Sequence, residues 1–112
     1  RVGLSLSGND VFLNVAGGVR ISEPAADLPV ACALASSFLN RPARMDTVVF
    51  GEVGLVGEVR AVARAGERVR EAARMGFRRC LLPHANLRDL ALEKGVELAG
   101  VSSLGEAVES LL

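Results

Sequence analysis

Helix-like and strand-like segments alternate along the second half of the sequence, and this alternation constrains the fold more than any other feature. The expected elements are, in order, a helix over residues 65–75, a strand over 77–82, a helix over 86–94, a strand over 96–101 and a closing helix to residue 112. Gly76, Pro83 and Gly95 separate successive elements. Alternation of this kind predicts parallel strand pairing.

Capping signals mark the starts of two of these helices. Asn86 is expected to cap the helix that ends at Lys94. Ser102 or Ser103 is expected to cap the closing helix, and Glu106 stands three residues after Ser103, the spacing of a capping box.

The first half of the chain predicts two hairpins separated by a helix. The expected elements are strands over 2–6 and 11–15, a helix over 25–39, a strand over 47–50 and glycine-dependent paired strands over 51–62. Pro29 fits the helix only in its first turn. Apolar residues surround this helix almost completely, so it should be buried between other elements. The predicted fold is an α/β domain with a mixed sheet and packed helices, in the order β-β-α-β-β-α-β-α-β-α.

Composition predicts an aliphatic core and no strong long-range field. Half of the 112 residues are apolar, yet there are four Phe and no Tyr or Trp. The formal net charge is zero, so any binding to nucleic acid or membrane must come from local clusters of charge. Because the first residue is Arg1 and not Met, we expect residues 1–112 to be a single domain cut from a longer protein.

Two cysteines and one histidine offer little metal or redox chemistry. Cys32 and Cys80 stand among aliphatic residues, without the spacing of a zinc or redox motif, and are expected to be buried. His84 follows Pro83 and has no second His or Cys nearby. No signal peptide or membrane-spanning run is recognisable, so a cytoplasmic location is expected.

Arginine clusters between residues 60 and 79. Against only Glu67 and Glu71, seven arginines give this stretch a local charge of +5. One interpretation is a solvated face with Glu67–Arg70 and Glu71–Arg74 pairs; the other is a patch that contacts nucleic-acid phosphates without reading sequence. No aromatic residues lie between the arginines in a way that would stack on bases.

Three motifs identify a family. They are the segment EPAAD over 23–27, the run VFGEVGLVGEV over 49–59, and the passage AARMGF over 72–77 that leads to Leu82–Pro83. Together they resemble the proteolytic domain of Lon, and more closely the C-terminal Lon-like domain of the RadA (Sms) family of bacterial DNA-repair ATPases. The resemblance covers nearly the whole chain and implies the Lon proteolytic-domain fold.

The resemblance also implies that the Lon catalytic dyad is missing. The motif places Ala25 where Lon has its nucleophilic Ser, and Gly66 where Lon has its general-base Lys. Arg68 cannot substitute, because a guanidinium stays protonated, and Lys94 ends another helix. We therefore expect no catalytic residues and no enzyme activity in this chain.

By resemblance, the chain serves a ring-forming, RecA-like ATPase that drives branch migration during recombination. It is expected to be a scaffold for a hexameric ring and a DNA-binding surface, with DNA, further copies of itself and the RecA recombinase as partners. ATP, Mg and Zn are expected in the full-length protein and no cofactor in this chain. The residues expected to contact DNA are Arg20, Arg60, Arg64, Arg68, Arg70, Arg74 and Arg78.

Other interpretations remain open. The domain could serve oligomerisation without contacting DNA, and a Ser–Lys peptidase is the least favoured reading. Ser22 is better explained as a helix N-cap or a strand-end hydroxyl than as a displaced nucleophile. Glu23 and Asp27 are expected to interact with the helix dipole or with Arg20 rather than to form an acid–base pair.

Overall fold

The structure is a computed structural model that describes residues 23–91 and 93–112. Its helices are η1 (Pro24–Ala26), α2 (Asp27–Leu39), α3 (Ala65–Arg74), η2 (His84–Asp89) and α4 (Leu104–Leu111), where η denotes a 3-10 helix. Its strands are β1 (Thr47–Val49), β2 (Glu52–Val53), β3 (Val59–Arg60), β4 (Arg79–Pro83) and β5 (Glu97–Val101). The strands expected over 2–6 and 11–15 lie outside the described residues.

A parallel sheet in the order β1-β4-β5 forms the centre of the molecule. Val48 lies opposite Cys80, which lies opposite Leu98. All residues of β1 and β4 are buried, as is typical of parallel strands covered on both faces. The prediction of parallel pairing in an α/β fold is confirmed. The short β2 and β3 pair antiparallel in a separate hairpin, which confirms the paired strands expected there.

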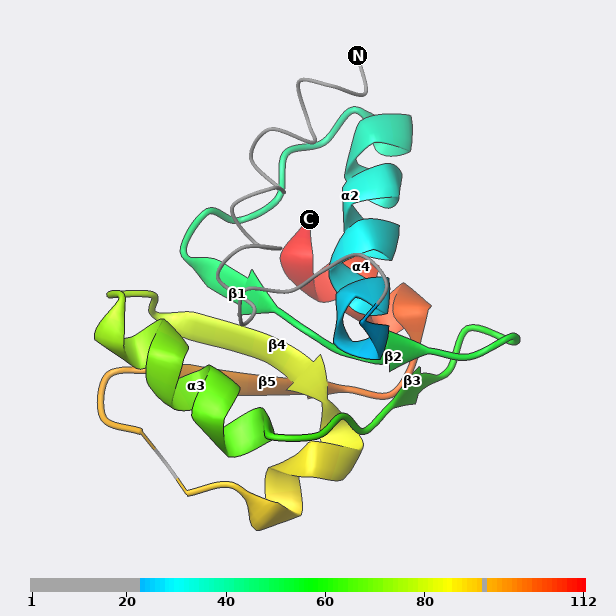
Figure 1. Ribbon diagram of the computed structural model, residues 1–112. Helices are drawn as coiled ribbons and strands as arrows, with labels where there is room; N and C mark the ends of the chain where they lie inside the picture. Colours follow the sequence, from blue (N-terminus) through cyan, green and yellow to red (C-terminus); the bar gives the residue numbers. More distant parts are fainter. Residues whose placement is uncertain (1–22, 92) are drawn as a thin grey trace.

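Helices cover both faces of this sheet (Figure 1). Val48, Phe50 and Cys80 belong to the core beneath α3. Val49 and Leu81, their immediate neighbours, belong to the core shared with α2 and α4. Adjacent strand residues thus supply opposite faces, as the two-residue repeat of a strand requires. The core is aliphatic apart from Phe50, in line with the composition.

The helix predicted over 25–39 forms, but its burial differs from the expectation. The chain makes one 3-10 turn, continues as α2 from Asp27, and ends at Asn40 in the left-handed conformation (φ 55°). Pro29 lies in the first turn, as expected. The prediction that the helix is buried on all sides is wrong, because Phe38 is 88% exposed and Leu34 is 55% exposed.

The helix predicted over 86–94 is also wrong. The structure has the short 3-10 helix η2 there, and Leu90 is already extended. The Asn86 side chain does not cap a helix; it accepts from Val62 N (3.0 Å) and donates to Val62 O (3.1 Å). Leu87 packs closely against Gly100 of β5, where a Cβ would come within 2.5 Å of the Leu87 side chain. Long-range contacts therefore hold this segment in a form that is not α-helical.

The closing helix α4 begins with the predicted cap. Ser103 Oγ accepts from Glu106 N at 3.1 Å. The Glu106 carboxylate returns to the backbone N–H of Ser102 at 2.6 Å, so the reciprocal bond forms one residue earlier than expected. Within residues 23–91 and 93–112, no helix has both the length and the apolar character to cross a membrane.

Candidate functional site

A cleft of about 350 Å³ opens beside η1, between this helix and the connector that links β3 to α3. We call it the Ala25 cleft. Its lining residues are Glu23, Pro24, Ala25, Glu52, Ala61, Val62, Ala63, Arg64 and Arg68. The backbone of η1 is attached to the end of β1, because Gly51 N donates to Ala25 O at 3.0 Å. Ala25, which the motif resemblance aligned with the Lon nucleophile, is thus held at a cleft but offers only a methyl group.

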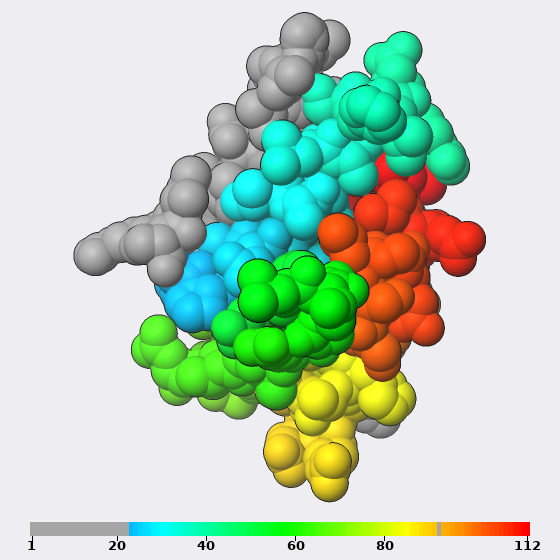
Figure 2. Space-filling view, turned by 90° about the vertical axis from the view of Figure 1, so that its right-hand side faces the viewer, coloured from blue at the N-terminus to red at the C-terminus, as the bar shows by residue number. Residues whose placement is uncertain are grey.

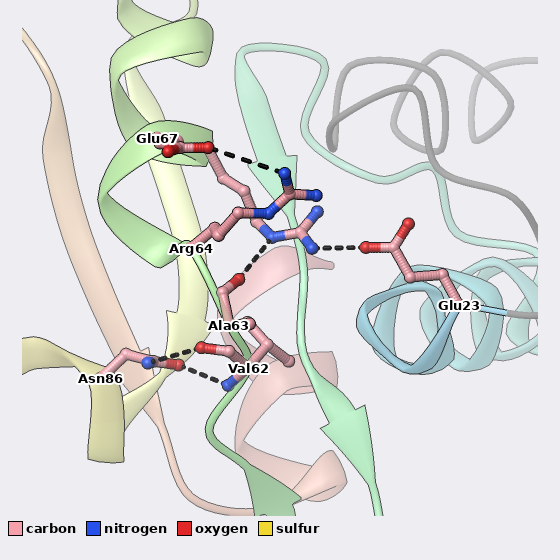
Figure 3. A network of polar contacts seen from close by, with 7 residues as sticks. Glu23, Val62, Ala63, Arg64, Glu67 and Asn86 are labelled. Carbon is pink, nitrogen blue, oxygen red and sulfur yellow. Dashed lines mark hydrogen bonds and ion pairs between the residues drawn. The ribbon is translucent and has the colours of Figure 1, made fainter.

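A buried ion pair joins the two walls of this cleft (Figure 3). The guanidinium of Arg68, whose side chain is 7% exposed, pairs with the Glu23 carboxylate. Arg68 Nε also donates to Ala63 O at 3.2 Å. The guanidinium carbon lies 5.8 Å from the centre of the Phe50 ring, within the range of a cation–π interaction. Arg68 therefore connects η1, the connector and the end of β1, and does not lie on the surface as Arg64 and Arg70 do.

Glu23 differs from the expectation, whereas Asp27 lies where the dipole interaction was expected. Glu23 pairs with Arg68, and its side chain makes no capping bond to η1. Asp27 lies in the first turn of α2, where the dipole favours its charge, and also accepts from Val53 N at 3.2 Å. Arg20, the alternative partner, lies outside the described residues.

Gly66, which the motif resemblance aligned with the Lon base, is not among the residues that line the cleft. A Cβ at Gly66 would lie 3.5 Å from Arg70 Nη1 and 3.8 Å from Leu90 Cδ2. The structure thus brings Ala25 together with Arg68, rather than with Gly66.

Contacts with other segments fix the backbone conformation of the connector between β3 and α3. Asn86 holds both backbone groups of Val62, and Arg64 adopts a left-handed conformation (φ 59°) at the start of α3. A non-glycine residue in this conformation is uncommon and is maintained here by the contacts on either side. The Arg64 guanidinium consequently lies 3.9 Å from the Glu67 carboxylate of the next turn (Figure 3).

The arginines expected to contact DNA fall into three groups. Those with an exposed ion pair are Arg60 with Glu58, Arg64 with Glu67 and Arg74 with Glu71. Arg70 and Arg78 are exposed, and neither makes an ion pair with another described residue. Arg68 is buried, and Arg20 lies outside the described residues. The Glu71–Arg74 pair of the solvated-face interpretation is present, whereas Glu67 lies near Arg64 instead of Arg70.

Charges of both signs mix around the outer face of α3. Arg70 and Arg74 share a shallow groove with Glu67, Glu71 and Glu93. At the hairpin, hydrogen bonds from Arg60 at 3.0 and 2.7 Å lower the pKa of the exposed Glu58 carboxyl, and Glu58 in turn raises the pKa of Arg60. Exposed pairs of this kind are weak, so little free energy is needed to replace the carboxylate partner of each arginine by another anion.

The remaining polar residues of the cluster and the cysteines are structural. Arg79 is buried and donates to Ser110 at the end of α4. Burial confirms the interpretation of Cys32 and Cys80 as core residues and raises the pKa of each thiol to about 12. In the described part of the chain, no group of three or more His, Cys, Asp or Glu side chains is placed to hold a metal ion.

Comparison with known proteins identifies the family. The model of the ChlI family, described as subunit ChlI of Mg-chelatase, matches residues 1–86. The chain is 47% identical over 112 residues to DNA repair protein RadA of Halalkalibacterium halodurans and of Bacillus subtilis, in each case 100% of the chain. RadA of Escherichia coli is 48% identical over 106 residues, 95% of the chain. The chain belongs to the RadA family and carries a ChlI-type domain.

The similarity covers only a part of each relative. The chain spans 24% of the length of the first two RadA proteins and 23% of the Escherichia coli protein. The resemblance to RadA inferred from the three motifs is confirmed, and it rests on a region of about a quarter of those proteins.

Three features of this RadA-type domain were not foreseen from its sequence. Glu23 and Arg68 lie 45 residues apart, and no local pattern signals that they pair. The Asn86 clamp on Val62 spans 24 residues and replaces the expected helix cap. Leu55 and Val56 are exposed on the hairpin, where the glycine spacing suggested only a turn or bulge.

Proposed function

We propose that this chain is the non-catalytic, Lon-like domain of a RadA-type DNA recombination and repair protein. In this role residues 1–112 form one domain of a longer cytoplasmic protein, serve as a scaffold for a hexameric ring, and contribute DNA-binding surface during branch migration. The observation that carries the proposal is the 47% identity to named DNA repair proteins over the entire chain. Elsewhere in the full-length protein we expect ATP, Mg and Zn, with RecA as a further partner.

A Lon-like fold without peptidase activity is part of this proposal. The Ala25 cleft occurs where the family motif places the Lon nucleophile, and a parallel sheet with a preceding helix supports the same architecture. A Ser–Lys dyad needs a hydroxyl and an amine within hydrogen-bond reach, and Ala25 and Gly66 supply neither. Arg68 occupies the cleft in an ion pair with Glu23 instead.

Arg70 and Arg78 are the strongest candidates for phosphate contacts, because both are exposed and neither gives up an ion pair with a described residue to bind DNA. Arg60, Arg64 and Arg74 would first exchange a weak surface partner. We expect the contacts to be sequence-independent, since phosphate binding carries no base information.

The test is the salt dependence of duplex binding by the chain with Arg70→Ala and Arg78→Ala together. The slope of log affinity against log salt should fall in magnitude by up to about 2, since each phosphate contact contributes roughly 0.9. The loss should be equal for unrelated DNA sequences. A matched control replaces Arg41 and Arg88, two exposed arginines outside the cluster, and changes the net charge equally. A slope that both variants alter to the same extent would exclude a specific patch at residues 70 and 78.

A second candidate function is oligomerisation without DNA contact. It is favoured by several large apolar side chains on the surface, including Phe38, Leu55 and Val56. Exposed apolar residues that gather at one place mark interaction sites more often than isolated ones do. Sedimentation of the chain up to millimolar concentration, together with the duplex titration, distinguishes the two functions: association without any duplex affinity favours the pure scaffold.

A further inference from the structure

The tip of the β2–β3 hairpin, residues 54–57, presents two aliphatic side chains to solvent. Leu55 is 102% exposed and Val56 is 90% exposed. In the space-filling view this green hairpin stands at the centre of one face, beside the blue segment that begins the described chain and the orange C-terminal segment (Figure 2). Two fully exposed neighbouring aliphatic residues are costly to hydrate unless a partner covers them.

Hydrogen bonds hold this tip in a defined shape. Gly54 N donates to Glu58 O at 2.8 Å, and Gly57 N donates to Gly54 O at 3.0 Å. The Glu58 carboxylate folds back over the turn, accepts from Val56 N at 3.2 Å, and would lie 2.0 Å from any Cβ at Gly54. A tip already ordered in this way loses little conformational entropy when it binds.

The hairpin is also anchored to the rest of the molecule at its base. Val59 N donates to Ser102 O at 2.9 Å, and Leu104 N donates to Gly57 O at 2.8 Å. Backbone hydrogen bonds at the start of α4 therefore hold the turn in place. The two exposed side chains therefore belong to a hydrogen-bonded hairpin rather than to an unsupported loop.

The Ala25 cleft has the chemistry and size to receive such a tip. Most of its wall is small and apolar, from Pro24–Ala25 on one side and 61–63 on the other. Leu and Val side chains together hold seven carbon atoms, and at about the volume of one water molecule each (~30 Å³) they fit within 350 Å³. The charged lining residues are two Glu and two Arg, so their charges balance, and Arg68 is already paired with Glu23 inside the cleft.

A hairpin tip cannot enter the cleft of its own chain. Glu52 and Ala61, which line the cleft, stand at or just beyond the base of the same hairpin, and the strands lead from there to the tip. The complementary surface is consequently available only from a second copy.

We infer that the tip of one copy inserts Leu55 and Val56 into the Ala25 cleft of a second copy. This inference rests on the proposed scaffold function and specifies its contact surface. Each copy offers one tip and one cleft, so the contact is head-to-tail and generates a ring if the rotation between copies closes. The two side chains bury on the order of 200 Å² of apolar surface, well below the ~800 Å² per partner of a stable interface. The contact is therefore weak between two isolated copies and increases with concentration.

Sedimentation velocity on the 112-residue chain, from micromolar to millimolar concentration, tests the contact with two classes of variant. Leu55→Ser with Val56→Ser removes the tip. Ala61→Arg, or Ala63→Arg as a second choice, fills the cleft from an exposed wall position. The unmodified chain should associate with rising concentration, and each variant alone should stay monomeric. Met75→Ser, which removes an exposed apolar side chain elsewhere, is the matched control and should associate like the unmodified chain.

Mixing the two variants gives the decisive result. The cleft-filled variant still has a tip and the tip-less variant still has a cleft, so an equal mixture should form a 1:1 heterodimer and nothing larger. A mixture that stays monomeric overturns the inference, as do variants that associate like the unmodified chain, but both outcomes leave the scaffold function standing. An unmodified chain that is monomeric at millimolar concentration overturns the inference and the scaffold function together. Circular dichroism of every variant controls for folding.

Discussion

At the scale of single residues, Arg68 shows how burial changes the role of a charged side chain. Its neighbours Arg64 and Arg70 are exposed on the same helix, and nothing in their order along the chain distinguishes the three. Position 68 faces the core side of α3 with Val69 and Ala72, and so its guanidinium enters the Ala25 cleft and meets Glu23. The sequence therefore places Arg68 among the arginines of a cationic surface, whereas in the structure it is a buried side chain that connects two segments.

We predict that Arg68→Ala lowers the free energy of unfolding by about 2–3 kcal/mol, as measured by urea denaturation. The change leaves the half-buried Glu23 carboxylate without this partner and removes the bond to Ala63 O. Arg70→Ala, an exposed change on the same helix, is the control and should alter stability by no more than about 0.5 kcal/mol. Equal effects of the two substitutions would show that the buried pair contributes nothing specific. A Glu23→Ala, Arg68→Ala double variant measures the coupling between the two side chains.

At the scale of elements, a side-chain cap marks the start of α4, whereas α2 and α3 begin without one. α4 starts at the residue that the capping-box spacing indicated. Ser103 Oγ accepts from Glu106 N, one of the N–H groups that the helix leaves free, and the Glu106 carboxylate accepts from the N–H of Ser102 just before the helix. Asn86 offers the same side-chain chemistry and yet caps nothing, since Val62 uses its amide from 24 residues away. A side chain caps a nearby helix only where no distant backbone group already uses its hydrogen-bonding atoms.

We predict that Ser103→Ala destabilises the chain by about 1 kcal/mol, the usual loss for an N-cap hydroxyl. In a domain of this size that corresponds to a fall in melting temperature of about 4–8 °C. Ser102→Ala is a closely matched control, because only the backbone N–H of Ser102 takes part in the cap. Thermal unfolding by circular dichroism measures both. Similar melting temperatures for the two variants would contradict the assigned cap.

At the scale of the whole molecule, two faces of one sheet carry different structures. α2 and α4 pack together on one face, and α3 covers the other. The Ala25 cleft lies beside the β2–β3 hairpin, because Glu52 of β2 is among its lining residues. The cleft contains the ion pair between Glu23 and Arg68.

We predict that Ala25→Ser together with Gly66→Lys does not create useful proteolysis. A Lys at position 66 would begin beside Arg70 and Leu90 rather than in the cleft lining. Glu23 and Glu52 in the cleft would also keep a nearby amine charged, and no preorganised oxyanion site has been supplied. Casein cleavage by the double variant, with an active Lon protease as positive control, is the measurement. Robust cleavage that a Ser-directed inhibitor abolishes would show that a competent site survives.

The sequence by itself determined the main elements, part of their parallel pairing and the family. Helices over 27–39, 65–74 and 104–111 follow from apolar spacing and terminal signals, which depend on interactions within a few residues. The parallel pairing of β4 with β5 was predicted from the alternation of elements in the second half of the chain, whereas the parallel pairing of β1 with β4 became known only from the structure.

Only the tertiary structure decided which polar groups are available at the surface. Arg68 is buried because Glu23 comes to it from 45 residues away, and η2 is not an α-helix because Val62 and Gly100 hold Asn86 and Leu87. The exposed face of α2 and the bare hairpin tip depend likewise on which elements pack against them. Periodicity records local backbone preference, whereas ion pairs and burial depend on contacts between segments that no short stretch of sequence contains.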